Sequence, residues 1–255
     1  MLRGKTAFIT GTNRGLGRAF VEEFAKNGAD VVAHARRDSA GFRESCSELA
    51  ETFSVKVMPV FFDLTDSTAM KTAVRELIAD KTPINVLVNS AGIAHGGLFQ
   101  MTAMAKVREV FDVNLFAQME LTQLLFRYMI KNGEGSIINI ASISGMDLLA
   151  GNCAYGVSKA AIIAFTKTLA AECGANGVRV NAVSPGLTDT DMATQMEEIS
   201  GNHIVERSAM NRRARPEEIA KAVVFLASDD ASFINGTVLR IDGGGVEYDT
   251  RTRRN

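Results

Sequence analysis

Short apolar runs rich in Val and Ile alternate along the chain with longer stretches in which apolar residues recur at helical spacing. This alternation predicts strands and helices in turn, as in a parallel sheet covered by helices. Strands are expected near 5–10, 30–35, 55–62, 84–89, 135–141, 178–183 and 237–241, and helices near 15–27, 39–53, 67–80, 103–132, 153–174 and 215–228. The pattern therefore predicts an α/β protein with a single Rossmann-like, doubly wound domain, whose parallel sheet of about seven strands has helices on both faces.

One stretch departs from this regularity. Residues 188–213 are polar, contain scattered methionines and show no clear core period. After Pro185-Gly186 such a segment suits a lid over a substrate, and a long surface loop is the other interpretation. We expect residues 1–245 to form the domain, with the lid at about 188–213, and residues 246–255 to form a polar tail that is solvated or contacts a partner.

The composition fits one globular domain of ordinary size. The chain has 255 residues, of which 46% are hydrophobic and 22% charged, so a large core fits but a second catalytic domain does not. The formal net charge of -1 gives no electrostatic reason to expect nucleic acid or an anionic membrane as a partner.

Targeting and metal signals are absent from the sequence. The chain opens without an apolar leader, and no run reaches the roughly 18 apolar residues of a membrane span. Three cysteines without Cys-x-x-Cys spacing indicate reduced thiols and a cytoplasmic protein. The three histidines have no metal-ligand spacing, so no metal site is predicted. Only His95 could face a substrate, and a plain loop position is the alternative.

A glycine-rich turn follows the first predicted strand. Thr6-Ala-Phe-Ile9 leads into Thr10-Gly-Thr-Asn-Arg-Gly-Leu-Gly17 and then into a helical pattern. Its three glycines allow a tight turn and a close approach to a pyrophosphate, whose charge would lie against free N–H groups at the helix start. The spacing differs from the usual G-x-G-x-x-G, so the order of strand, turn and helix carries the inference. A glycine-rich connection without a ligand is the alternative.

The residues after the second strand predict which dinucleotide is bound. An acidic residue would be expected there if a ribose 2′-hydroxyl were recognised, but Ala35 is followed by Arg36 and Arg37. Arg14 lies in the glycine turn, so its guanidinium and that of Arg36 could converge on a 2′-phosphate. The sequence therefore favours NADP(H) over NAD(H), while Arg37 fits a solvated surface charge.

Tyr155 and Lys159 are the most informative residues for chemistry. They stand four apart in Ala154-Tyr-Gly-Val-Ser-Lys-Ala160, so a helix places them on one face. A phenol titrates near pH 10 unless a nearby positive charge stabilises the phenolate, and Lys159 is expected to lower its pKa in this way. Ser142, upstream at a strand end, could donate a hydrogen bond to a substrate oxygen. A surface Tyr over a Lys is the alternative.

These motifs together resemble the short-chain dehydrogenase/reductase family, in its NADP-preferring subgroup, over nearly the whole chain. The agreement includes Asp63-Leu64, Asn89-Ser-Ala-Gly92, Asn114 in Asp-Val-Asn-Leu, and Pro185-Gly186 with Thr190. The resemblance implies a catalytic tetrad of Asn114, Ser142, Tyr155 and Lys159. It implies cofactor binding by Gly11, Asn13, Arg14, Gly15, Leu16, Gly17, Arg36, Asp63, Leu64, Asn89, Ala91, Gly92, Tyr155, Lys159, Pro185, Gly186, Thr188 and Thr190.

The resemblance also implies roles for single residues. Asp63 would meet the adenine, residues 89–92 would support the central strand and the cofactor, and residues 185–190 would hold the nicotinamide carboxamide. Asn114 would hold a water that relays protons from Lys159. The reaction implied is hydride transfer between the nicotinamide and a carbonyl carbon, with proton transfer by Tyr155.

The substrate is less defined by the sequence. The segments Pro185-Gly-Leu-Thr-Asp-Thr-Asp-Met192 and Phe225-Leu-Ala-Ser-Asp-Asp230 are most similar to those of 3-oxoacyl-[acyl-carrier-protein] reductases. Those enzymes dock the carrier protein with two arginines, whose places here are taken by Gly133 and Ala171. A small carbonyl compound, a sugar or polyol, or a steroid is an alternative substrate. Met146, Leu148 and Leu149 would give an apolar pocket wall or, equally, pack in the core.

Two further functions stay open. An NADP-binding sensor or scaffold without catalysis would keep the fold, although all four tetrad positions are filled. A role in assembly draws on the helices at 103–132 and 153–174, whose partly apolar outer faces resemble the interface by which the family forms homodimers and homotetramers.

Overall fold

The computed structural model describes residues 1–147, 150–194 and 208–245. Its sheet has seven parallel strands in the order β3-β2-β1-β4-β5-β6-β7. The strands are β1 (Thr6–Ile9), β2 (Asp30–Ala35), β3 (Val57–Phe61), β4 (Val86–Asn89), β5 (Gly135–Ile140), β6 (Val178–Pro185) and β7 (Val238–Ile241). The α/β fold predicted from the apolar runs is confirmed, and the strand positions differ from the prediction only at their ends.

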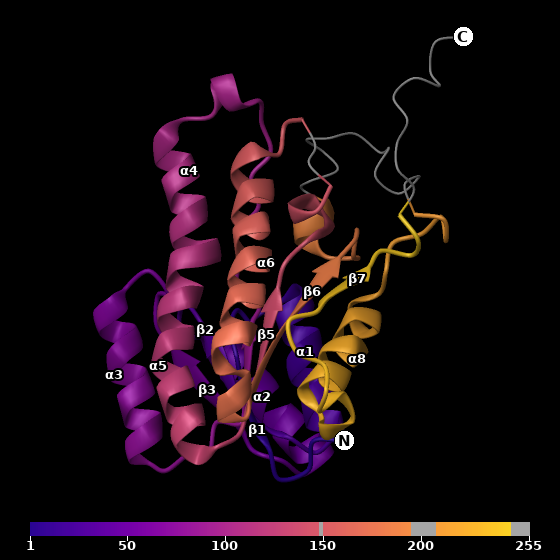
Figure 1. The fold of residues 1–255 in the computed structure, drawn as a ribbon. Coiled ribbons are helices and arrows are strands. Elements are labelled where there is room, and N and C mark those ends of the chain that lie inside the picture. The colour runs from indigo at the N-terminus through magenta and orange to yellow at the C-terminus, as the bar shows by residue number, and fades with distance from the viewer. Residues whose placement is uncertain (148–149, 195–207, 246–255) are drawn as a thin grey trace.

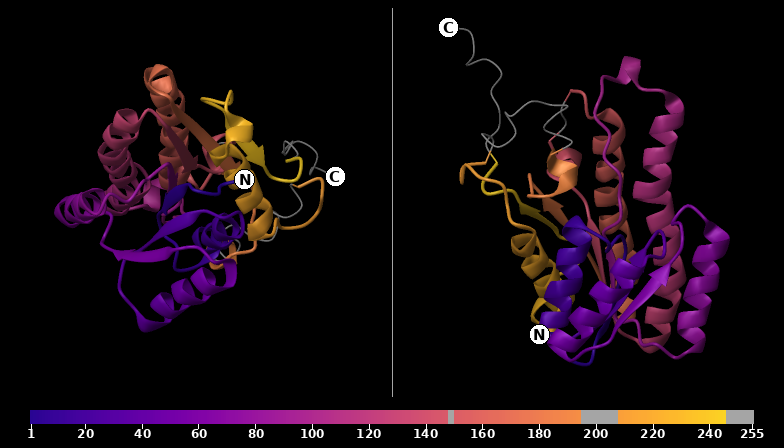
Figure 2. Two further views of the ribbon diagram at one scale, coloured as in Figure 1. Left: turned by 90° about the horizontal axis from the view of Figure 1, so that it is seen from below. Right: turned by 180° about the vertical axis from the view of Figure 1, so that it is seen from behind.

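Helices cover both faces of the sheet (Figures 1 and 2). On one face lie α1 (Gly15–Lys26), α2 (Ala40–Phe53) and α8 (Pro216–Ala227); on the other lie α3 (Ser67–Ala79), α4 (Met104–Phe111), α5 (Ala117–Asn132) and α6 (Cys153–Cys173). Neighbouring strand residues serve opposite layers: Phe8 packs with the α3 and α5 side chains, and Ile9 with those of α1 and α8. Burial on both faces explains the continuous apolar runs of the strands.

Local signals in the sequence begin and end several helices. The Ser39 and Asp66 side chains accept hydrogen bonds from the first backbone N–H groups of α2 and α3. Pro216 occupies the first turn of α8, and Gly133 ends α5 in the left-handed conformation at φ 69°. These caps explain why the predicted helix boundaries lie close to the observed ones.

One predicted helix contains an irregularity. The run expected at 103–132 consists of α4, a π-helical segment (Asp112–Phe116) and α5. Within that segment the Asn114 side chain accepts a hydrogen bond from the Ile93 N–H (2.8 Å) and donates one to the Ile93 carbonyl oxygen (3.0 Å). This contact draws the helix toward the loop after β4, and π-helical turns often occur at functional sites.

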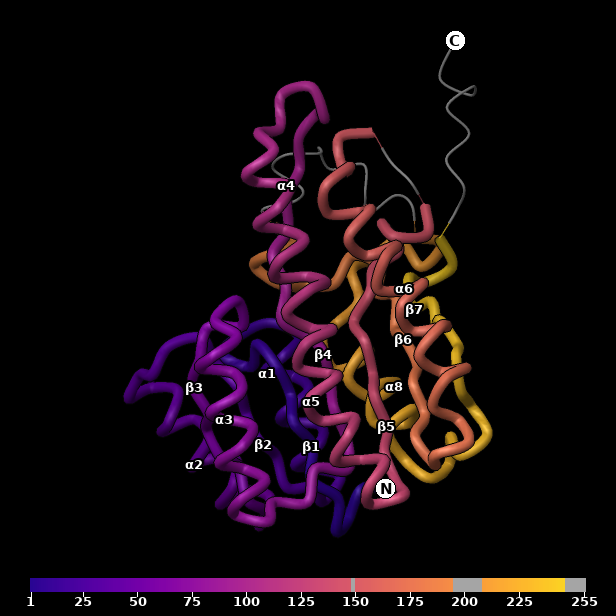
Figure 3. The backbone as a smooth tube through the Cα atoms, turned by 60° about the vertical axis from the view of Figure 1, so that its left-hand side comes forward, coloured from indigo at the N-terminus to yellow at the C-terminus, as the bar shows by residue number. Residues whose placement is uncertain are grey.

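The strands β1 and β4, which are far apart in the sequence, lie side by side in the middle of the sheet (Figure 3). Strand order runs one way from β1 to β3 and the other way from β4 to β7, so the connections diverge between β1 and β4. In such sheets the ligand lies beyond the carboxyl ends of the strands at this divergence. The loops after β1, β4, β5 and β6 all meet there.

Only the ends of the predicted lid belong to the described residues. Thr188 forms a β-bridge with Ala214, so the two ends of the predicted lid lie side by side. Residues 195–207, Leu148, Leu149 and the predicted tail at 246–255 lie outside the described part of the chain. Among the described helices, none combines the length and apolar character needed to cross a membrane.

Candidate active site

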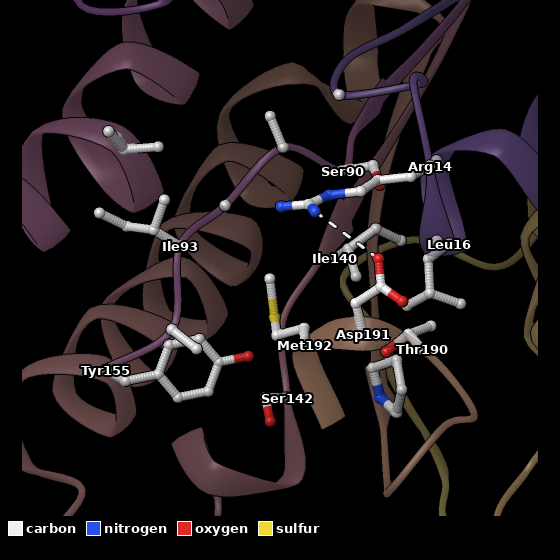
Figure 4. A pocket seen from close by; sticks show the side chains of 18 of the residues that line it. Arg14, Leu16, Ser90, Ile93, Ile140, Ser142, Tyr155, Thr190, Asp191 and Met192 are labelled. Carbon is white, nitrogen blue, oxygen red and sulfur yellow. Dashed lines mark ion pairs between the residues drawn. The ribbon is translucent and has the colours of Figure 1, made fainter. Parts of the chain in front are cut away.

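A cleft of about 870 Å³ lies at the carboxyl ends of the strands, where the predicted residues were expected to meet (Figure 4). The predicted residues that line it are Gly11, Asn13, Arg14, Gly15, Leu16, Gly17, Arg36, Asp63, Leu64, Ala91, Gly92, Ser142, Tyr155, Lys159, Pro185, Gly186, Thr188 and Thr190. Asn89 and Asn114 are fully buried just beneath the lining. The structure thus brings together all but two of the predicted positions.

The glycine turn has the close packing expected of a phosphate cradle. Gly11 and Gly15 have positive φ values of 71° and 58°. A Cβ on Gly11 would lie 2.8 Å from the Ala91 Cα, and a Cβ on Gly17 would overlap the Gly11 carbonyl oxygen. Helix α1 begins at Gly15, and no side chain of Arg14 caps its N-terminus. The first N–H groups of α1 thus lie at the edge of the cleft without a side-chain cap, which fits the pyrophosphate of a dinucleotide.

His34 supports this turn, although the sequence offered no reason to single it out. Its Nδ1 accepts a hydrogen bond from the Gly11 N–H (3.3 Å), and its Nε2 donates to the Phe62 carbonyl oxygen (2.9 Å). Burial lowers the pKa of the imidazole to about 4, so the ring is neutral at physiological pH. The His34 carbonyl oxygen also accepts from the Thr12 N–H at 2.9 Å. One side chain thus ties β2 and β3 to the glycine turn.

The arginines predicted to recognise a 2′-phosphate line the cleft, and each is paired with a carboxylate. Arg36 donates to Asp63 at 2.7 Å, and Arg14 lies 3.6 Å from Asp191. Burial disfavours ionisation of Asp63, but hydrogen bonds from Thr65 and the Arg36 guanidinium hold the pKa of that carboxyl below its usual value. Both guanidinium groups are mostly exposed, so they can change partners at little cost.

The loop after β4 is held from below by buried polar side chains. Thr10 Oγ1 accepts hydrogen bonds from the N–H groups of Ser90 (2.9 Å) and Ala91 (3.0 Å). Asn89 faces the sheet and α5 instead of the cleft, donating to Thr122 Oγ1 at 2.9 Å and to Asn139 Oδ1 at 2.8 Å. Asn89 therefore links the central strands to α5, and the residues after it form part of the cleft wall.

The amide of Asn114 is already used by the protein. Its Nδ2 donates to the Ile93 carbonyl oxygen (3.0 Å) and to Ser158 Oγ (3.1 Å), and its Oδ1 accepts from the Ile93 N–H. A Cβ on Gly92 would lie 3.1 Å from Asn114 Oδ1 and 3.6 Å from Lys159 Nζ, so the three residues converge. Only the second lone pair of Oδ1 is left for the proton relay predicted from the resemblance.

Tyr155 and Ser142 face each other across the floor of the cleft. Tyr155 lies in the first turn of α6, Ser142 follows β5, and both hydroxyls point into the same space beside Met192 (Figure 4). Burial raises the pKa of the phenol, and the hydrogen bond with Ser142 partly offsets this effect. The phenol is therefore a proton donor at neutral pH.

Lys159 does not act on Tyr155 as predicted. Its Nζ donates to the Ile140 carbonyl oxygen at 2.7 Å and lies 5.8 Å from the centroid of the Tyr155 ring. Burial lowers the pKa of the ammonium group to about 8. The expectation that Lys159 lowers the pKa of Tyr155 is wrong for the protein by itself, because desolvation outweighs the attraction of an ammonium directed at a backbone oxygen.

The segment after β6 forms the remaining wall. A Cβ on Gly186 would lie 2.7 Å from the Asp242 Cβ, so this turn passes tightly over the end of β7. A Cβ on Gly15 would lie 3.7 Å from Thr190, which places the segment over the glycine turn. Met192 lies beside the hydroxyls of Tyr155 and Ser142 (Figure 4). The predicted segment 185–190 thus spans both halves of the cleft.

Several lining residues carried no signal in the sequence. They are apolar residues of the cleft wall whose spacing resembles that of ordinary core positions: Ile93, Ala94, Val113, Ile143, Leu187 and Met192. His95 is absent from the lining and lies 3.3 Å from Thr102 Oγ1. The described residues contain no group of three His, Cys, Asp or Glu side chains that could hold a metal ion.

Known proteins similar to this chain agree with the geometry. A family model described as enoyl-(acyl carrier protein) reductase matches residues 11–245. The 3-oxoacyl-[acyl-carrier-protein] reductase of Thermotoga maritima is 37% identical over 245 residues, which are 96% of this chain and 99% of that protein. The Escherichia coli reductase of the same description is 31% identical over 241 residues, covering 94% and 97%.

One solved structure shows the same fold with a different described substrate. A candidate NAD(P)-dependent gluconate 5-dehydrogenase from Beutenbergia cavernae, with NADP bound at low occupancy, matches with a TM-score of 0.89 and 36% identity. The match covers 95% of this chain and 96% of that one. The relatives therefore divide between acyl and sugar-acid chemistry.

Proposed function

This chain belongs to the short-chain dehydrogenase/reductase family of oxidoreductases, and from that premise we propose that it interconverts a ketone and a secondary alcohol with NADP(H). Tyr155 is the general acid or base of the reaction. The observation that carries the proposal is the meeting of Tyr155, Ser142 and Lys159 in one cleft with the glycine turn. Tyr155 and Ser142 would meet the carbonyl group of a substrate in the same cleft in which the glycine turn would hold the hydride-donating dinucleotide.

The glycine turn and its neighbours support a phosphorylated dinucleotide. Uncapped N–H groups at the start of α1 suit the pyrophosphate, and Arg14 with Arg36 supplies two cations for a 2′-phosphate. Asp63 would contact the adenine, and Thr188 with Thr190 would contact the nicotinamide carboxamide. When bound, this dinucleotide supplies or accepts the hydride at the carbonyl carbon.

The protein's own groups handle the proton. In the reductive direction Tyr155 donates its phenolic proton to the carbonyl oxygen as charge develops there, and Ser142 donates a hydrogen bond to the same oxygen. The raised pKa of the phenol keeps this proton in place at neutral pH. Lys159, whose pKa is about 8, is mostly cationic at neutral pH. Its ammonium group lies 5.8 Å from the centroid of the Tyr155 ring, where it can limit the cost of the phenolate without bringing the pKa of the phenol below its ordinary value.

The apolar walls around the proton donor favour a substrate with carbon substituents on its carbonyl. Ile93 and Met192 lie at this end of the cleft (Figure 4), and desolvation there strengthens the hydrogen bonds at the reacting oxygen. A 3-oxoacyl compound is therefore our first candidate, in agreement with the curated relatives. A sugar acid is the second candidate, favoured by the structural match to the gluconate dehydrogenase candidate.

A substrate panel tests the proposal. Purified protein is mixed with NADPH or NADH and with 3-oxoacyl esters, simple ketones and keto-sugar acids, and loss of reduced-cofactor absorbance is followed. We expect NADPH oxidation with at least one carbonyl class and slower oxidation of NADH. Tight NADPH binding without turnover on any substrate would replace the enzyme by a cofactor-binding sensor.

A further inference from the structure

An arginine at the far edge of the sheet reaches back to the loop that carries Ser142. Arg240 lies on β7, and its Nη1 and Nη2 donate to the two carboxylate oxygens of Asp147 at 3.0 and 2.7 Å. Its Nε donates to Asp242, which directly follows β7. The side chains of Arg240 and Asp147 are 33% and 42% exposed and that of Asp242 is 8% exposed, so the pair with Asp147 is partly buried. Bidentate, partly buried pairs of this kind restrict geometry more than ordinary surface pairs do.

The loop between Ser142 and Asp147 is a compact unit. It starts where the Ala141 N–H bonds the Val183 carbonyl oxygen (2.8 Å). Inside it, Ser142 Oγ accepts from the Ser144 N–H at 3.1 Å, and the Asp147 N–H donates to the Ile143 carbonyl oxygen at 2.7 Å. A displacement of Asp147 is therefore passed through these bonds toward Ser142.

This loop also lies directly on the helix that carries Tyr155 and Lys159. A Cβ on Gly145 would lie 2.6 Å from the Lys159 carbonyl carbon, and a Cβ on Gly156 would lie 2.7 Å from the Ser144 carbonyl oxygen. Neither glycine leaves room for a side chain, so the loop and α6 are in van der Waals contact. The loop is thus enclosed by α6 on one side and by the Arg240 pair on the other.

We propose that Arg240, through Asp147, is a positioning residue that holds Ser142 against Tyr155 for proton transfer. The proposal rests on the proposed function of this cleft as a site of carbonyl reduction. Without the guanidinium, Asp147 loses its two hydrogen bonds, and the loop is anchored only at its β5 end and by its packing on α6. A hydroxyl displaced by even a fraction of an ångström no longer follows the substrate oxygen as its charge develops.

The test uses Arg240→Gln and Asp147→Asn, each also combined with Ser142→Ala. With a carbonyl compound that the wild type reduces, Arg240→Gln should lower kcat roughly tenfold and leave KM for NADPH within about twofold. Asp147→Asn should do the same. A variant that carries both Arg240→Gln and Asp147→Asn should lose no more kcat than either single variant. In the Ser142→Ala background, Arg240→Gln should change kcat less than about twofold, because there is no hydroxyl left to position.

Arg43→Gln is the matched control. Arg43 forms a similar bidentate pair with Asp38 at 2.7 Å for both bonds, and neither residue lines the cleft. Its removal should leave kcat unchanged. If Arg240→Gln does not fold, Asp147→Asn carries the test, since Arg240 then keeps its bond to Asp242.

Hydrogen exchange separates this proposal from the proposed function. The amides of Ser144 and Gly145 should exchange faster in Arg240→Gln than in wild type or Arg43→Gln, whether or not the protein reduces a carbonyl compound. Unchanged exchange would overturn the proposed positioning role of Arg240 and Asp147. So would an equal kcat loss with and without the Ser142 hydroxyl, or a loss confined to KM for NADPH. A wild type that reduces no carbonyl compound would defeat the proposed function. The hydrogen-exchange rates of Ser144 and Gly145 alone would then test whether Arg240 positions the loop.

Discussion

The two ends of the cleft hold their charges in opposite ways. At the dinucleotide end, Arg14 and Arg36 are 75% and 70% exposed and are paired with carboxylates in water. At the proton-transfer end, Lys159 is 4% exposed and its ammonium group contacts a backbone oxygen. Exposed pairs exchange partners at little free-energy cost, whereas a buried ammonium is held in place by the fold. The first end is therefore suited to cofactor choice and the second to chemistry.

Replacing Tyr155 by Phe should break the proton-transfer end and leave the other intact. The proton donor is removed without changing the ring, so turnover should fall roughly a thousandfold or more. The affinity for NADPH, measured by fluorescence titration, should change less than about twofold. Tyr128→Phe, which removes a hydroxyl bonded to the Thr82 carbonyl oxygen outside the cleft, is the control. Retention of more than a few per cent of activity in Tyr155→Phe contradicts the assignment.

The converse change is Gly17→Ala, which should damage the dinucleotide end. The added Cβ would overlap the Gly11 carbonyl oxygen, so the turn must shift. Overpacking of this kind costs about 1–3 kcal/mol. Where this strain destabilises the conformation of the turn that binds NADPH, the affinity for NADPH should drop roughly tenfold to hundredfold. Gly41→Ala, where a Cβ meets nothing within 4 Å, should bind NADPH normally. Calorimetric titration of both variants decides, and equal affinities would show that the turn does not contact the cofactor.

Features that depend on the order of strands and turns could be predicted from the sequence, whereas contacts that only the fold creates could not. The strands, the glycine turn and the convergence of loops were predictable because parallel strands are continuous apolar runs and ligand sites lie at their ends. His34 was not, since its role depends on the Gly11 N–H and the Phe62 carbonyl oxygen, which only the fold brings to its ring. The π-helical turn at Asn114 likewise arises from contact with Ile93.

The proton-transfer end shows the same limit in its electrostatics. Spacing placed Tyr155 and Lys159 on one helix face, and the structure agrees. Spacing could not show that the ammonium group turns toward the Ile140 carbonyl oxygen or how strongly the phenol is desolvated. For the protein without its cofactor, the direction of the pKa shift of Tyr155 was therefore wrongly predicted. Apolar lining residues such as Met192 are indistinguishable by pattern from core residues.

The cost of the buried ammonium can be measured with Lys159→Met. Burial lowers the pKa of Lys159 from 10.5 to about 8, which disfavours the charged form in the fold by about 3 kcal/mol. Loss of the hydrogen bond to the Ile140 carbonyl oxygen destabilises the variant by about 1 kcal/mol. At pH 7 the variant should therefore gain about 2 kcal/mol in free energy of unfolding while losing activity.

The stability gained by Lys159→Met should depend on pH. Because the folded-state pKa is depressed, the penalty in the wild type is fully present below pH 8 and disappears as the pH rises toward 10.5. Urea unfolding at pH 7 and pH 9 should show the advantage of Lys159→Met shrinking at the higher pH. An advantage that stays constant would mean that Lys159 is not the group that titrates.

Arg36→Asp should sharpen the comparison by changing cofactor choice alone. The new carboxylate removes a cation from the 2′-phosphate position and lies beside Asp63, so KM for NADPH should rise roughly tenfold while KM for NADH changes little. Arg37→Asp, which alters the neighbouring arginine of the lining, should have a smaller effect. Steady-state kinetics with both cofactors measures the ratio, and an equal rise for both would remove Arg36 from phosphate recognition.

The smallest effect is expected at Asp191, whose carboxylate lies 3.6 Å from the Arg14 guanidinium across the cleft (Figure 4). Both side chains are about three-quarters exposed, at 75% and 73%, so the pair is worth less than about 1 kcal/mol. Asp191→Asn frees Arg14 for the cofactor phosphate, and the Kd for NADPH should fall about two- to threefold at low salt. The gain should vanish near 1 M salt, where the screening length is about 3 Å.

Asp189→Asn, which removes the same charge two residues earlier and outside the cleft lining, should leave the Kd unchanged at any salt concentration. Weaker binding in Asp191→Asn would mean that the pair stabilises the bound conformation and does not compete with the phosphate.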